Sequence, residues 1–213
     1  MIADRSPTKA FTVFELLLII LVLMVVAALL LPALSTQHTS CRINCTNNLK
    51  QIGLSFKTWS LDNNDLLPMQ VPGTNGGSME ATIQGLAFPS FQAMSNELST
   101  PKILVCPNDE KRIPATSFAS LTDRQLSYFL CQNPAEAGNP GLLTGDRNLT
   151  NALVQGTRAI SFTTFLSLSW TKEMHTRQGN VGFNDGSVVQ FRNGEFMLKR
   201  HGQEARANRL LLP

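Results

Sequence analysis

His175 and Asp185 are the side chains of this 213-residue chain that most readily suggest catalysis or metal binding. A general base needs a partner within hydrogen-bond reach, and a zinc site needs three or four ligands. The other histidines are His38 and His201, and no H-x-x-x-H spacing is present. Since G-x-S-x-G, P-loop and G-x-G-x-x-G motifs are also missing, we expect a protein that is not an enzyme. Asp185 and Gly186 suit a hairpin turn, beside which His175 would pack or hydrogen-bond.

The four cysteines permit three different pairings into two disulfides. Cys41 and Cys45 lie one helical turn apart, where an ideal helix orients both side chains poorly for a bond. Cys106 follows one expected strand and Cys131 ends another. We therefore favour a Cys106–Cys131 disulfide between neighbouring strand ends, with the other pairings left open.

These candidates belong to a chain with an uneven distribution of polarity. Only 15% of the residues are charged, against about 25% in ordinary soluble domains. From residue 16 to residue 31 no side chain is polar, and from 16 to 41 none is formally charged. The net charge of +3 comes without a basic cluster and does not indicate nucleic-acid binding. A hydrophobic content of 43% excludes a fully disordered chain.

The apolar segment at residues 11–34 contains an acidic residue near its start, Glu15. A secretory signal peptide has a shorter apolar core and a small-x-small cleavage site, and neither is found here. A plain membrane anchor fits the length, with Arg5 and Lys9 on the cytoplasmic side. It does not explain Glu15, because a carboxylate costs about 2.5–3.5 kcal/mol at the centre of a bilayer. Such residues usually have a partner and a role.

Residues 9–17 read KAFTVFELL. This string resembles the processing site of type IV pilins and type II secretion pseudopilins. The resemblance implies that a prepilin peptidase cuts between Ala10 and Phe11 and N-methylates Phe11, which makes Glu15 the fifth residue of the mature chain. Ala10 stands where the family usually has Gly. The resemblance also implies a single-pass inner-membrane protein with a cytoplasmic N-terminus and a periplasmic or extracellular C-terminal domain.

The implied role of Glu15 is to set the register of a filament. In a packed assembly its carboxylate can pair with the Phe11 amine of a neighbouring subunit, and a charge pair in an apolar bundle is costly when misaligned. The alternative is an uncleaved anchor with Glu15 at the membrane interface. The expected partners are the prepilin peptidase, other pilin-like subunits and an inner-membrane assembly platform.

A helical stripe follows the apolar segment. Cys45, Leu49, Ile52, Phe56 and Trp59 recur at the three- and four-residue spacing of one helix face. The stripe predicts that the N-terminal helix continues past the membrane face and packs on a sheet.

The remainder of the chain predicts short strands at 102–105, 126–130 and 159–162, a hairpin at 179–191 and a short helix at 90–98. We therefore expect an α+β fold in which a long N-terminal helix packs on a small antiparallel sheet. The expected segments are a leader at 1–10, a transmembrane half-helix at 11–34, its amphipathic continuation at 35–65 and an extracytoplasmic α+β domain at 66–213.

A second resemblance lies in the expected hairpin. His175, nine intervening residues and Asp185-Gly186 match the H-X9-DG segment of a branch of bacterial prepilin-like proteins. The strings NNLKQIG at 47–53, CPND at 106–109 and SYF at 127–129 also resemble that branch.

The likeness to pseudopilins also leaves calcium open as a ligand, because major pseudopilins can hold it in a C-terminal loop. The possible ligands here are Asp109, Asp123, Asp146 and Asp185. No D-x-D-x-D spacing accompanies them, and otherwise we expect no cofactor and no metal.

The sequence thus predicts a pilin-like subunit of a type II secretion pseudopilus or a type IV pilus. The rival hypothesis is a membrane-tethered extracytoplasmic binding domain that never enters a filament. Assembly requires cleavage and Glu15, whereas a tether requires neither.

Overall fold

The computed structural model describes residues 12–35, 37–134, 141–150, 159–162, 166–167, 169–193, 197–198 and 208–213. The expected cleavage site at Ala10 and Phe11 lies outside the described residues. The chain divides into two compact units, with the division between Ser40 and Cys41.

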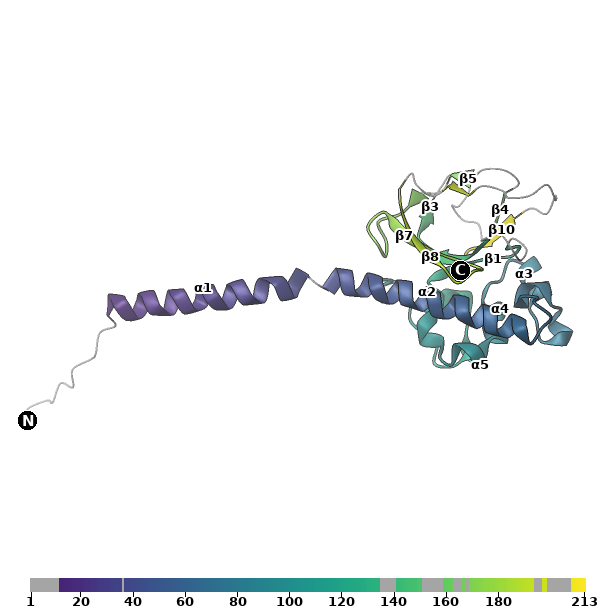
Figure 1. Cartoon of the computed structure of the whole chain (residues 1–213), viewed down its shortest axis with the longest axis horizontal. Coiled ribbons are helices and arrows are strands. Elements are labelled where there is room, and N and C mark those ends of the chain that lie inside the picture. Colours follow the sequence, from purple (N-terminus) through teal and green to yellow (C-terminus); the bar gives the residue numbers. More distant parts are fainter. Residues whose placement is uncertain are drawn as a thin grey trace, which may run out of the picture. The chain divides into compact units, whose positions relative to one another are not determined.

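Helix α1, Val13–Ser35, contains the apolar segment (Figure 1). Its first turn is closed by a reciprocal capping box: the Thr12 amide and hydroxyl donate to Glu15 Oε2 at 2.9 and 3.0 Å, and the Glu15 amide donates to Thr12 Oγ1 at 3.3 Å. The large apolar side chains from Val13 to Leu29 are 42–76% exposed. Within the described part of the chain, no helix combines the length and apolar character needed to cross a membrane.

Helix α2, Gln37–Leu61, carries the predicted stripe. From Cys41 onward it belongs to the same compact unit as the sheet and runs along one face of it (Figure 1). All five residues of the stripe are buried, with exposed fractions of 6% or less: Cys45, Leu49, Ile52, Phe56 and Trp59. The stripe was therefore a correct prediction of the helix face that packs in the core.

Short helices follow α2. They are η1 (Pro68–Gln70), η2 (Gly73–Asn75), α3 (Met79–Ile83), α4 (Phe88–Ala93), α5 (Ser95–Leu98), η3 (Pro101–Leu104), η4 (Phe118–Ser120) and η5 (Asp123–Gln125). The helix expected at 90–98 is confirmed as α4 and α5, but the strand expected at 102–105 is wrong. Thr100 caps η3 by accepting a hydrogen bond from the Lys102 amide, and Pro101 suits the first helical position.

The strands are β1 (Tyr128–Cys131), β2 (Leu142–Asp146), β3 (Leu149–Thr150), β4 (Ala159–Phe162), β5 (Leu166–Ser167), β6 (Ser169–Trp170), β7 (Gln178–Phe183), β8 (Val188–Arg192), β9 (Met197–Leu198) and β10 (Asn208–Leu211). Six of them form one antiparallel sheet in the order β4-β10-β1-β2-β7-β8. The pairs β3-β6 and β5-β9 form two small sheets. The strands predicted near 126–130 and at 159–162 and the β7–β8 hairpin are thus confirmed.

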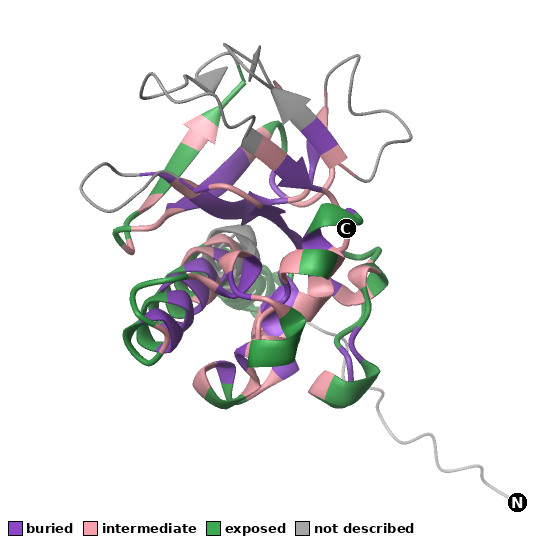
Figure 2. Cartoon of the chain, turned by 90° about the vertical axis from the view of Figure 1, so that its right-hand side faces the viewer, coloured by how far each residue is buried: buried purple, intermediate pink, exposed green. Residues whose placement is uncertain are grey.

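The six-stranded sheet has a hydrophobic cluster on each face. Along β1, Tyr128 and Leu130 join the cluster that includes the α2 stripe, while Phe129 and Cys131 join the opposite cluster around Trp170. This follows from the alternation of side chains along a strand. Figure 2 shows the central strands as almost wholly buried. The predicted α+β class, with an antiparallel sheet and an N-terminal helix, is confirmed at this level.

Candidate functional site

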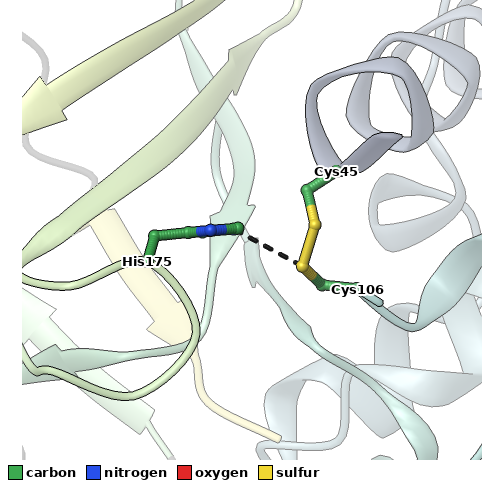
Figure 3. A group of neighbouring side chains, drawn as sticks. All are labelled: Cys45, Cys106 and His175. Carbon is green, nitrogen blue, oxygen red and sulfur yellow. Dashed lines mark hydrogen bonds between the residues drawn. A yellow bond between two sulfur atoms is a disulfide. The ribbon is translucent and has the colours of Figure 1, made fainter. Parts of the chain in front are cut away.

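Three segments that are far apart in the sequence converge on one buried cluster. Cys45 comes from α2, Cys106 lies two residues after the end of η3, and His175 comes from the loop before β7 (Figure 3). Cys45 and Cys106 form a disulfide with their Cα atoms 5.2 Å apart. The two sulfurs and a ring nitrogen of His175 all lie within 4.8 Å of one another, and each residue is at most 1% exposed.

The pairing of Cys106 with Cys131 was a wrong prediction. Cys131 is a buried thiol outside any disulfide, and its side chain lies in the cluster on the other face of the sheet. The prediction failed because the segment before Cys106 is helical and does not pair beside β1. Burial raises the pKa of the Cys131 thiol to about 12, so it is unreactive. The side chain of Cys41 lies outside the described residues.

The contacts of His175 identify which ring nitrogen carries the hydrogen. The Asn108 amide nitrogen donates to the Met174 carbonyl at 3.0 Å, which fixes the orientation of that amide, and it lies 3.4 Å from His175 Nδ1. Nδ1 is therefore the acceptor, and Nε2 carries the hydrogen. Nε2 lies 3.4 Å from Asp146 Oδ2 and 3.4 Å from Cys106 Sγ.

The two titratable groups of this pair are shifted in opposite directions. Burial lowers the pKa of His175 to about 4, with a further contribution from the positive charge of Arg42. Burial raises the pKa of Asp146 to about 7, although hydrogen bonds from the amide and side chain of Asn180 oppose the rise. Both shifts disfavour charge, as expected for groups removed from water. The imidazole is neutral at pH 7, so it is poorly suited to stabilise a thiolate.

An unusual backbone holds His175 in place. Its neighbours Met174, Thr176 and Arg177 have φ values of 58°, 49° and 60°, in the left-handed region that non-glycine residues seldom adopt. Such conformations cost of order 1–3 kcal/mol each and persist only where surrounding contacts enforce them. The buried Asn148 amide supplies such contacts by donating to three carbonyls between residues 171 and 178, at 3.2–3.3 Å.

Asp185 and Gly186 form the turn between β7 and β8. Gly186 has a φ of 85°, and Asp185 Oδ1 accepts hydrogen bonds from the amide and hydroxyl of Ser187 at 2.8 and 2.6 Å. A Cβ placed on Gly53 of α2 would lie 3.8 Å from the Gly186 Cα, so the turn lies against the helix. Hydrogen bonds from Ser187, with a smaller contribution from Lys57, lower the pKa of Asp185. The His175 and Gly186 ends of the H-X9-DG segment thus both reach α2.

The four proposed calcium ligands are engaged separately. Asp109 accepts two hydrogen bonds from Arg147, at 2.6 and 2.7 Å, and one from Ser127 at 2.8 Å. Burial would raise the pKa of Asp109, but these partners hold it below its usual value. Asp123 accepts two backbone amides at the start of α4. In the described ranges, the one group of three possible metal ligands is Cys45, Cys106 and His175.

No protein-family model, curated protein or solved structure matches the chain.

The geometry identifies participants that the sequence reasoning missed. Asp146 was considered only as a calcium ligand, and its contact with His175 depends on the pairing of β2 with β7. The capping partner of Glu15 could have been found, because Thr12-x-x-Glu15 has the spacing of a capping box. In the disulfide form, the cluster connects α2, the turn after η3 and the sheet.

Proposed function

We propose that this chain is a structural, pilin-like subunit that assembles through its N-terminal helix into a type II secretion pseudopilus or a type IV pilus. A prepilin peptidase would cleave it between Ala10 and Phe11 and methylate Phe11. The observation that carries the proposal is the string KAFTVFELL, whose last five residues begin a helix with exposed apolar side chains.

Because the apolar side chains of α1 are exposed in the single chain, we expect lipid or another protein to cover this helix. Burying one large aliphatic side chain is worth about 1.5–3 kcal/mol, and a helix that is apolar on all sides is normally surrounded by lipid or by protein. In the proposed cycle, the inner membrane supplies the first environment and other subunits supply the second. The membrane step rests on the sequence, in which the uncharged run continues past Leu29 to Cys41.

The disulfide supports a location outside the cytoplasm. Disulfides persist in oxidising compartments such as the bacterial periplasm and are rare in the cytosol. A domain held by Cys45–Cys106 and preceded by an apolar helix fits a periplasmic position, with the N-terminus in the cytoplasm. The proposed role needs no cofactor. Its partners are the peptidase, other pilin-like subunits and an assembly platform.

Glu15 has two separable roles in this proposal. In the single chain its carboxylate completes the capping box with Thr12. In a filament it would pair with the Phe11 amine of a neighbouring subunit, and removal of one partner from a buried pair costs about 3–5 kcal/mol. A glutamine keeps the capping hydrogen bonds and loses the charge, whereas a valine loses both.

The test is cross-linking between cysteines engineered on α1 of neighbouring subunits, at equal membrane abundance. We expect Glu15→Gln and Glu15→Val to abolish or strongly reduce cross-linking, while membrane insertion and peptidase cleavage persist. Thr12→Ala is the matched control, because it removes the two capping hydrogen bonds made by the Thr12 hydroxyl and keeps the charge of Glu15, and it should cross-link nearly as wild type. Intact-mass analysis should show loss of residues 1–10 and one added methyl group.

Two outcomes contradict the proposal. A chain that keeps its first ten residues in cells with active peptidase is not a processed pilin. If both Glu15 variants cross-link as wild type does, Glu15 does not set a register. The membrane-tethered binding domain is then the better description.

A further inference from the structure

The cluster around the disulfide contains the ligand set of a metal site. We propose that, before the disulfide forms, the thiol form of the chain binds one zinc-class divalent ion through Cys45, Cys106, His175 and Asp146. Disulfide formation and metal binding would then be mutually exclusive uses of the same cysteines. This proposal does not depend on assembly into a filament.

The spacing of the fixed ligand atoms supports it. Tetrahedral zinc sites have metal–ligand distances of about 2.0–2.2 Å to nitrogen and oxygen and about 2.3 Å to sulfur, which separates neighbouring ligand atoms by about 3.3–3.6 Å. His175 Nε2 lies 3.4 Å from Asp146 Oδ2 and 3.4 Å from Cys106 Sγ. Two edges of such a tetrahedron are therefore already close to the required length. The carboxylate of Asp146 does not lie within 4.8 Å of all three other ligand atoms, so its side chain must move toward the sulfurs on binding.

The cysteine pair must also adjust. Once the sulfur–sulfur bond is absent, the two thiolates must separate to about 3.8 Å around a tetrahedral ion. Cys45 and Cys106 come from different segments with their Cα atoms 5.2 Å apart, so rotation of the side chains can open the pair. The ion would connect α2, the turn after η3, the loop before β7 and the end of β2.

Asp146 provides an independent indication of a missing ligand. Asp146 is fully buried, and its Oδ1 atom has no hydrogen-bond partner among the described residues. A buried carboxylate oxygen without a partner is costly, and it is uncommon in folded proteins. The oxygen near His175 is Oδ2, which already accepts two hydrogen bonds from Asn180, so rotation of the carboxylate would bring Oδ1 to the ion and satisfy it there. Because all four ligands come from the chain and are at most 1% exposed, the site would be closed and structural, with no position for a substrate.

The protons balance as follows. Two thiols become thiolates on binding and Asp146 binds as a carboxylate, so two protons pass to solvent, and a third when Asp146 is protonated beforehand. The hydrogen on His175 Nε2 must also leave, and the ring takes one up at Nδ1, so the imidazole stays neutral. Asn108 must then turn its amide so that the oxygen accepts from Nδ1, which breaks the hydrogen bond that its nitrogen donates to the Met174 carbonyl. A hydrogen bond to the non-ligating nitrogen is the usual way in which a metal-bound histidine is oriented.

The experiment uses the full chain in detergent micelles with Cys41→Ser and Cys131→Ala, which leaves only the two cysteines of the site. A water-soluble phosphine reduces the disulfide under anaerobic conditions. One water molecule supplies the oxygen atom of the phosphine oxide and the two hydrogen atoms of the thiols. Cobalt(II) is then added as the spectroscopic substitute for zinc. The oxidised protein is the matched control.

We expect the reduced protein to bind one cobalt ion with thiolate-to-cobalt charge transfer and the visible bands of a tetrahedral site, and zinc should displace it. The oxidised protein should show neither signal. Asp146→Asn should weaken binding at least about tenfold. His175→Ala should also weaken binding at least about tenfold, because it removes a ligand.

The proposal is overturned if the reduced chain binds no cobalt, whether or not it remains folded. It is also overturned if the bound cobalt lacks thiolate charge transfer, or if His175→Ala leaves the affinity for cobalt unchanged. Equal affinities for wild type and Asp146→Asn would remove the carboxylate from the ligand set and refute the site in the form proposed.

Discussion

Reduction of the Cys45–Cys106 disulfide should lower the stability of the unit that begins at Cys41. The two cysteines are 61 residues apart in the sequence. In the chain-entropy model, a cross-link that closes a loop of this length lowers the conformational entropy of the unfolded state by about 14 cal/mol/K. This loss stabilises the folded state by about 4 kcal/mol at 25 °C. A domain of this size has a total stability of only about 5–15 kcal/mol. The disulfide therefore supplies a large part of the total stability.

Urea denaturation can measure this difference. With a denaturant slope of about 2 kcal/mol/M, a loss of 4 kcal/mol moves the unfolding midpoint down by about 2 M. Trp59 and Trp170 are the only tryptophans, and they are 6% and 1% exposed, so their fluorescence reports on both hydrophobic clusters. A chelator must be present, so that no metal ion takes the place of the disulfide.

The control identifies the partner of Cys106. Under oxidising conditions, Cys45→Ala should lower the midpoint by about as much as reduction does. Cys131→Ala should shift it far less, by the roughly 1 kcal/mol expected from a small change in a packed core. If reduction leaves the midpoint unchanged, the entropic argument is refuted. If Cys131→Ala reproduces the effect of reduction, the disulfide joins Cys106 to Cys131 after all.

Three further predictions concern the same unit. Protonation of His175 favours unfolding as the pH falls from 6.5 to 4, whereas ionisation of Asp146 favours unfolding as the pH rises from 4 to 7, so the two effects on stability oppose each other. Asp146→Asn should therefore make the free energy of unfolding rise more steeply with pH between pH 4 and 6.5, by about 1 kcal/mol per pH unit, and a slope equal to that of the wild type would refute this. Gly179→Ala should cost about 1–3 kcal/mol in thermal or urea unfolding, because its Cβ would overlap the indole ring of Trp170. Asp109→Asn should cost about 1–3 kcal/mol, because Arg147 loses its charged partner at 2.6 Å and keeps only the contact with Glu173 at 3.4 Å; an unchanged stability would contradict the buried ion pair.

Sequence patterns predicted the elements whose periodicity is long or whose turn chemistry is specific. The α2 stripe has five members in register, and Asp185-Gly186 marks a turn that few other residue pairs form as well. The segment at 102–105 is apolar and too short for periodicity to distinguish a strand from a helix. Thr100 and Pro101, which begin η3, were the local signals that favoured the helix.

The chemistry of the buried cluster was less accessible to sequence reasoning. The neighbours of His175 come from α2, the turn after η3 and β2, and their approach depends on strand order and register. The pKa shifts of His175 and Asp146 arise mainly from burial, which no spacing in the sequence reports. The disulfide could be predicted only in part from the sequence. Cys45 belongs to the stripe predicted to face the sheet, which already placed its sulfur in the core.

The two contacts of the H-X9-DG segment with α2 make its length matter as much as its composition. The cysteine and the glycine that receive them, Cys45 and Gly53, are a little over two helical turns apart, or about 12 Å along the axis. Between His175 and Gly186 the chain follows β7, where a shift of one residue moves every following side chain to the other face of the sheet. A single inserted or deleted residue would therefore pull one end off the helix. Substitutions in this stretch can be judged one position at a time, but insertions and deletions cannot.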